Sequence, residues 1–99
     1  MIRVEISKKK ITVKGHANQA AYGNDIVCAS VSTAVIMSVN QIEVFNKAHC
    51  IETKISDGNT CINIISEDEI VSKVIDNLVF TLKDLELQYP KYIKINEKL

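Results

Sequence analysis

The sequence predicts an α+β domain with two layers, in which one mostly antiparallel sheet is covered on one face by two helices. Two observations carry this prediction. Short stretches alternate apolar and polar residues, which is typical of half-buried strands. Two longer stretches repeat apolar residues at helical spacing. The element order is ββαββα, and the end of the chain is compatible with a short last strand. At 99 residues, we expect a single domain over positions 1–99.

The first half of the chain contains a hairpin, a loop and a helix. Residues 2–14 alternate in character on both sides of a lysine-rich turn and are predicted to form the hairpin. The stretch 15–24 has no sustained period and is expected to be a loop. Asp25 is a plausible N-cap residue for a largely buried helix over about 25–46.

The second half repeats the pattern. Residues 49–65 alternate on both sides of Asp57-Gly58, a strong turn signal, and are predicted to form a second hairpin. Ser66 and Glu69 have the spacing of a capping box, which predicts an amphipathic helix over about 67–87. Pro90 stops that helix, and residues 92–95 fit the short last strand.

Composition excludes several classes of function. The chain is 46% hydrophobic and 24% charged with zero net charge, so we expect no direct nucleic-acid partner, because such proteins usually carry a basic excess. No continuous run of about 18 apolar residues occurs, and the N-terminus lacks signal-peptide features. We therefore expect a cytoplasmic protein with no membrane partner. Three cysteines without a C-x-x-C pair indicate neither a disulfide framework nor a metal site, and no cofactor is expected.

One region combines a cysteine, a histidine, a loop and a helix start. If Asp25 caps the helix, Cys28 lies in the first turn, where free backbone N–H groups favour a thiolate and are available to bind an oxyanion. A helix terminus supplies only about 0.3–1 kcal/mol, too little to make a strong nucleophile. An imidazolium beside a thiol lowers its pKa much further, to about 3–4 in known cases. His16, at the end of the second strand, is the candidate for that role.

The residues alone leave a simpler interpretation open. A cysteine near the start of a buried helix is most often a small apolar residue, and a histidine at a strand end is most often exposed. Cys50 and Cys61 are expected in the core, and His49 is expected at the surface without a role.

A longer motif favours the catalytic interpretation. The string Gly15-His16-Ala17, followed by Gly23-x-Asp25-Ile26-Val27-Cys28-Ala29-x-Val31-Ser32, resembles the signature of the ribosomal-processing cysteine protease family, Prp. The spacing from histidine to cysteine agrees as well. Ser30 stands where alanine is more usual in the motif.

The resemblance implies a small α+β cysteine endopeptidase that acts as a homodimer. Its partner would be the N-terminal extension of a bacterial large-subunit ribosomal protein, cut after aromatic residues. By position, Cys28 would be the nucleophile and His16 the general base and acid. Gly15 and Ser32 fall on further motif positions, and Asp25 falls on an acidic motif position for which an assisting role has been suggested.

Several roles stay open at this point. Asp25 either caps the helix or orients His16, and Ser32 either leaves room near the sulfur or transfers a proton. Tyr22 and Gly23 belong to the predicted loop, which suits a mobile flap over the substrate. The alternative function is a non-catalytic, ribosome-associated module that binds a peptide without cutting it.

Overall fold

One five-stranded sheet and two long helices make up the protein. The structure is a computed structural model that describes residues 1–15, 22–56 and 58–98, with only the backbone described for residues 22–25. In chain order its elements are β1 (Ile2–Ser7), β2 (Lys10–Lys14), α1 (Tyr22–Val44), a 3-10 helix (Ala48–Cys50), β3 (Ile51–Ser56), β4 (Asn59–Ile64), α2 (Glu69–Gln88) and β5 (Ile93–Glu97).

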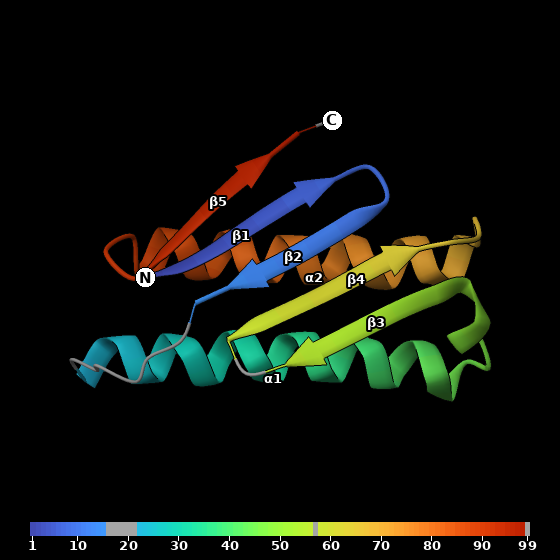
Figure 1. Cartoon of the computed structure of the whole chain (residues 1–99), viewed down its shortest axis with the longest axis horizontal. Helices are drawn as coiled ribbons and strands as arrows, with labels where there is room; N and C mark the ends of the chain where they lie inside the picture. Colours follow the sequence, from blue (N-terminus) through green and yellow to red (C-terminus); the bar gives the residue numbers. More distant parts are fainter. Residues whose placement is uncertain (16–21, 57, 99) are drawn as a thin grey trace.

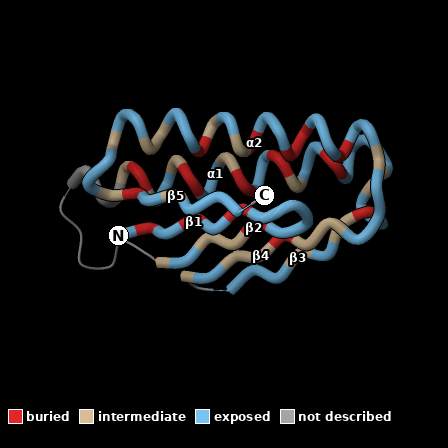
Figure 2. Tube along the Cα trace, turned by 90° about the horizontal axis from the view of Figure 1, so that it is seen from above, coloured by how far each residue is buried: buried red, intermediate tan, exposed pale blue. Residues whose placement is uncertain are grey.

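The strands lie in the order β3-β4-β2-β1-β5. All neighbours are antiparallel except β1 and β5, which pair in parallel because α2 carries the chain back across the sheet. Both helices cover the same face, so the molecule has two layers (Figures 1 and 2). The predicted α+β class is confirmed, including the short last strand.

The core lies between the sheet and the helices. Along β1, the side chains alternate strictly between buried and exposed, with Ile2, Val4 and Ile6 facing the helices. The helices meet this face with buried apolar side chains: Val27, Val31, Val35 and Ile42 from α1, and Val71, Val74, Ile75, Leu78 and Leu82 from α2. The opposite face of the sheet carries none of the helices of the described residues (Figure 2), and we refer to it below as the open face.

Both helices begin at residues other than those predicted. The α1 helix starts at Tyr22 and not near Asp25. The α2 helix is capped by Asp68 and not by Ser66, since an Asp68 oxygen accepts hydrogen bonds from the amides of Ile70 and Val71 at 2.9 and 3.1 Å. The predicted Ser66–Glu69 capping box is therefore wrong by two residues.

The composition of α1 is unusually apolar for a surface helix. Its segment Ile26–Val44 has a mean hydropathy of 1.4, long and apolar enough to cross a membrane by length and composition alone. Only 28% of that segment is buried. The helix packs one side on the sheet and lies beside α2, so that part of its apolar surface is covered within the domain (Figure 2).

Charged groups of α2 secure the edge of the sheet at β5. A Glu86 carboxylate oxygen accepts the Ile95 amide hydrogen bond at 2.7 Å, and Lys83 pairs with Glu97 at 2.7 Å. An unpaired strand edge invites association with other chains. Glu86 satisfies a β5 amide that would otherwise be free at this edge.

Asp68 also joins the two helical segments. Its second carboxylate oxygen lies 2.8 Å from the Lys47 ammonium, which follows α1. The hydrogen bond from Lys47, supported by the Val71 amide, lowers the pKa of Asp68 below its ordinary value. The same hydrogen bond raises the pKa of Lys47. Because the Asp68 pKa is lower in the folded state, its stabilising effect is present above the ordinary carboxyl pKa and disappears as the pH falls through the folded value.

We predict that Asp68→Asn lowers the midpoint of thermal unfolding at pH 7, because asparagine caps a helix but does not pair with Lys47. The gap between variant and wild type should close below the ordinary carboxyl pKa of about 3.9. Thermal melts monitored by circular dichroism from neutral to acidic pH measure this. As a control, Glu69→Gln removes only an exposed pair with Lys73 and should leave the midpoint nearly unchanged. A gap that does not depend on pH would contradict the assignment.

Candidate active site

Cys28 lies on the wall of a cavity of about 210 Å³. The cavity is formed where the side of α1 meets one end of the sheet, and the Cys28 side chain is partly buried against the core. The lining comes from four parts of the chain: Ile2; Val13 and Gly15; Cys28, Val31, Ser32, Val35 and Ile36; and Ile55, Ser56, Gly58, Asn59 and Thr60. The thiol therefore sits in a shaped, mainly apolar hollow at the edge of the core.

Gly15 is held firmly at the end of β2. Its amide donates a hydrogen bond to the Gly58 carbonyl at 2.9 Å, and its φ of 108° lies in the region that favours glycine. A Cβ at this position would collide with the Met1 carbonyl oxygen and lie 3.3 Å from the Ile2 Cα. Glycine is thus required here by both backbone conformation and close approach. Gly15, held on the cavity wall by these contacts, is the residue directly before His16 in the sequence.

The turn between β3 and β4 completes the cavity. Gly58, with a φ of 71°, accepts the Gly15 amide and brings Ile55, Asn59 and Thr60 to the hollow. Sequence reasoning predicted this turn but not its place beside Cys28. No local signal could have shown it, because the contact depends on β2 and β4 being neighbours in the sheet.

The structure revises the predicted surroundings of Cys28. Because α1 begins at Tyr22, Asp25 is the fourth residue of the helix and is not its N-cap. Cys28 is the seventh residue and lies in the second turn, where regular helical pairing directs its amide to the Asn24 carbonyl. The expectation that the Cys28 amide is free to bind an oxyanion is therefore wrong for this conformation.

Other predicted site residues are only partly covered by the structure. His16 lies outside the described residues. Tyr22 and Gly23 form the start of α1 and not the end of a loop, and their side chains, like that of Asp25, lie outside the described part. Ser32 is exposed and lines the cavity one helical turn after Cys28. The structure therefore brings Gly15, Cys28 and Ser32 to one hollow.

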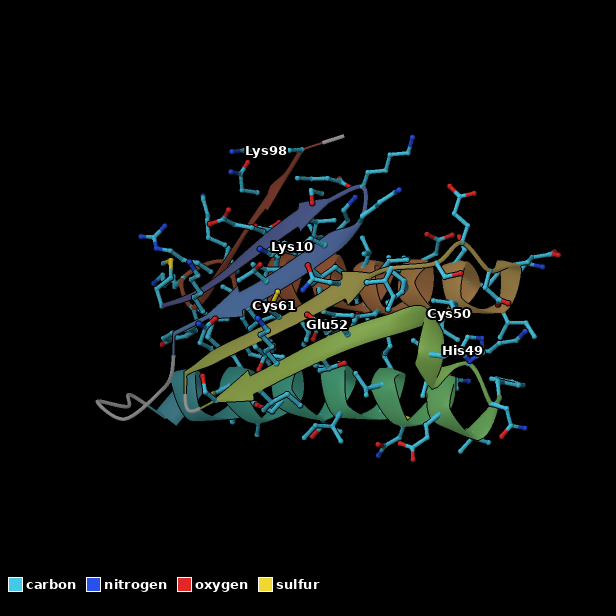
Figure 3. The ribbon with its side chains drawn as sticks, turned by 45° about the vertical axis from the view of Figure 1, so that its right-hand side comes forward. Lys10, His49, Cys50, Glu52, Cys61 and Lys98 are labelled. Atoms are coloured by element: carbon cyan, nitrogen blue, oxygen red, sulfur yellow. The ribbon has the colours of Figure 1, made fainter. Side chains whose placement is uncertain are left out.

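The remaining cysteines and the second histidine lie elsewhere (Figure 3). All three cysteines are free. Cys50 is buried in the 3-10 helix, as expected for a core residue, and His49 beside it is exposed. Cys61 is not a core residue: it lies on the open face of the sheet, where its sulfur accepts a weak hydrogen bond from the Asn63 side-chain Nδ2 at 3.5 Å. Among the cysteines, only Cys28 lines the cavity.

Comparison with known proteins identifies the family. Residues 1–94 match the family model described as cysteine protease Prp. The chain belongs to this family. The predicted membership and the predicted class, a cysteine-type peptidase, are therefore confirmed. A similar relative is the ribosomal processing cysteine protease Prp of Mycoplasma genitalium, 32% identical over 98 residues that cover 99% of this chain and 97% of the relative.

Solved structures of the family have the same fold. The chain resembles an essential ribosomal processing protease Prp from Staphylococcus aureus in complex with a substrate peptide, with a TM-score of 0.90, 25% identity and coverage of 99% and 100% of the two chains. The same protease with a covalently linked product peptide gives a TM-score of 0.86 at 26% identity, with the same coverage.

We predict that Gly15→Ala destabilises the protein by about 1–3 kcal/mol, because the backbone must move away from Met1 and abandon a strained φ. Urea denaturation of the variant and the wild type measures the difference in the free energy of unfolding. Gly58→Asn is the matched control, since asparagine tolerates a positive φ and should have a smaller effect. Equal losses in the two variants would show that close packing at Gly15 is not the cause.

Proposed function

We propose that this chain is an endopeptidase that removes the N-terminal extension of a bacterial large-subunit ribosomal protein, with Cys28 as nucleophile and His16 as general base and acid. The observation that carries the assignment is that Gly15 and Cys28 line the same cavity. His16 follows Gly15 directly, and consecutive Cα atoms are only about 3.8 Å apart. This attachment supports an approach of the imidazole to the sulfur.

The chemistry proceeds in two halves. His16 accepts the thiol proton, and the Cys28 sulfur attacks the scissile carbonyl carbon. The tetrahedral intermediate collapses as the imidazolium protonates the leaving amine, which departs as the new N-terminus. Water, deprotonated by His16, then hydrolyses the thioester and restores the thiol. The covalently linked product peptide in the Staphylococcus aureus relative supports an acyl-enzyme route of this kind.

The cavity beside the thiol suits an apolar side chain of the substrate. Six of its lining residues are aliphatic: Ile2, Val13, Val31, Val35, Ile36 and Ile55. Binding sites of this type hold an apolar group and orient it with a few polar groups, which Ser56, Asn59 and Thr60 supply here. The hollow therefore supports recognition of the aromatic residue that precedes the cut in this family's substrates.

Asp25 and Ser32 have supporting roles in this proposal. Since Asp25 is the fourth helical residue, its carboxylate is not needed as the N-cap, which favours its assistance to His16. Ser32 is a small residue on the cavity wall. Among the described residues, Ser30 and Ser38 bond back to helix carbonyls at 2.8 Å, whereas no such bond is formed by Ser32. Ser32 thus leaves space for substrate beside the sulfur.

We predict that Cys28→Ala abolishes cleavage of a peptide that carries the extension, because Cys28 is the one thiol among the described residues that line the cavity. His16→Ala should lower kcat by about 10²–10⁴-fold, the usual contribution of a general base. Asp25→Asn should give a smaller loss. Product formation followed by mass spectrometry measures all three.

Cys61→Ala is the matched control for these variants, since it removes a free thiol from the open face and should leave cleavage intact. Undiminished cleavage by Cys28→Ala would refute the assignment. A wild-type protein that binds the peptide without cutting it, and whose thiol alkylation rises only near the free-cysteine pKa of about 8.5, would favour the non-catalytic binding module. This proposal also places the protein in the cytoplasm, where its ribosomal substrate is made.

We further propose that the protein is a homodimer through the outer side of α1. Met37 and Val44 on this side are 69% and 78% exposed, although the helix is strongly apolar. Exposed apolar patches of this kind usually mark interaction surfaces. A second copy would cover the patch in an arrangement in which each α1 contacts its equivalent.

We predict that the wild type sediments at about twice the chain mass of 11.1 kDa, and that Met37→Lys shifts it to the monomer. Leu87→Lys, at an equally exposed position on α2, is the control and should remain dimeric. Sedimentation equilibrium measures both masses. A wild-type monomer at all concentrations, or a Met37→Lys dimer, would contradict the proposed interface.

A further inference from the structure

The open face of the sheet carries an excess of positive charge. The alternation of the strands places six basic side chains there: Arg3, Lys10, Lys14, Lys54, Lys94 and Lys98, the last of these one residue beyond β5. Among the described residues, two acidic side chains, Glu5 and Glu52, share the face. The formal net charge of the chain is zero. The basic excess on this face therefore means that most acidic side chains lie on other parts of the molecule.

Strand pairing arranges these groups in rows across the sheet. In one row, Lys94 of β5 pairs with Arg3 of β1, and Arg3 pairs with Lys14 of β2. Neighbouring strands are about 4.8 Å apart, so three like charges stand side by side. In a second row, Lys10 of β2 lies opposite Ser7 of β1. Figure 3 shows Lys10, Cys61 and Glu52 on three successive strands of this face. Lys98 lies on the other side of β1 in the same view.

The ion pairs of the described residues do not neutralise this face. They join Lys47 to Asp68, Lys73 to Glu69 and Lys83 to Glu97, and all of these lie on the helical side or at its ends. Like charges directly opposite each other in a sheet repel. The basic row of Arg3, Lys14 and Lys94 is therefore unfavourable in the free protein and favours a polyanionic partner.

The other side chains of the face indicate which polyanion fits. Between the charges stand Ser7, Thr12, Ser56, Asn59, Asn63 and Asn96. Lysine, arginine, serine, threonine and asparagine are the side chains that contact phosphate and sugar in nucleic acids. Protein interfaces instead have an apolar or aromatic centre. Cys61 is the nearest to an apolar side chain on the described strands of this face.

We propose that the open face of the sheet binds the phosphodiester backbone of RNA without reading its sequence. The surface is hollowed by a shallow depression of about 330 Å³ lined by Lys10, Lys14 and Lys98. Because no aromatic side chain occurs on the described strands of this face, base stacking adds nothing and binding rests on charge. The sequence expectation of no nucleic-acid partner rested on net charge, which does not show this separation.

The basic row is adjacent to the active-site cavity. Asn59 of β4 lies opposite Lys14, and Ser56 of β3 lies opposite Asn59, and both residues also line the Cys28 hollow. RNA bound along the row would hold the cavity close to whatever protein that RNA carries. The choice of RNA over other nucleic acids rests on the proposed function, since a ribosomal protein is found beside ribosomal RNA.

The test compares two double variants that lose the same two charges. Lys14→Gln with Lys94→Gln removes the flanks of the basic row, and Lys73→Gln with Lys83→Gln removes two lysines from α2. The probe is a fluorescein-labelled polyuridine of about 12 nucleotides, a typical length for a single-strand site. Fluorescence anisotropy gives Kd from about 50 to about 200 mM salt, and circular dichroism verifies that both variants are folded.

We expect the wild type and the α2 variant to bind alike. The open-face variant should bind about tenfold more weakly, and its salt slope should be smaller by about 1.4, or about 0.7 for each lost phosphate contact. Equal weakening in both variants, or no salt-dependent binding by the wild type, would overturn the proposal. So would polyglutamate binding as tightly as RNA, which would make the face a surface for acidic proteins. Binding is measured without cleavage, so failure here leaves the proposed peptidase activity untouched.

Discussion

The alternation of side chains along the strands is the constraint on which the rest of the molecule depends. In β1, Ile2, Val4 and Ile6 face the helices, while Arg3 and Glu5 face water. A slip of one residue in pairing would exchange the two sets and bury charge under α2. The same register therefore determines both faces of the sheet, one apolar and covered, the other charged and open.

That register also assembles the cavity beside Cys28. Pairing of β2 with β4 brings the end of one hairpin, at Gly15, next to the turn of the other, at Gly58. The packing of α1 on the covered face then places Cys28 on the wall of the same cavity. The cavity is thus a product of long-range strand pairing and helix packing. The close backbone approach at Gly15 determines where the segment that contains His16 begins.

Local sequence patterns predict the strands and helices but not the residues at which the helices begin. Apolar alternation and Asp57-Gly58 predicted both hairpins. Ser66 and Asp68 both satisfy the rules for an N-cap residue, and Asp68 also pairs with Lys47, which is 21 positions earlier in the chain. The apolar pattern of its strand predicts Cys61 in the core, and only the pairing with Thr12 shows that it faces outward.

The site was predictable only where its residues are close in sequence. The motif around Gly15 and Cys28 could be found by its spacing, whereas Ile2, Ile55 and Asn59 join the cavity through strand pairing that no short pattern encodes. The separation of charge has the same origin. Net charge is a property of composition, and the row of Lys94, Arg3 and Lys14 exists only because three remote segments are neighbours in the sheet.

The parallel pairing of β1 with β5 connects one wall of the cavity to a remote part of the chain. The Ile2 amide donates to the Tyr92 carbonyl at 2.9 Å, and Ile2 forms part of the wall beside Cys28. A nascent chain that ends before Tyr92 has no partner for this amide and no fifth strand. Because Ile2 meets this partner only across 90 positions of sequence, one wall residue beside the thiol is held by one of the non-local contacts that proteins form slowly during folding.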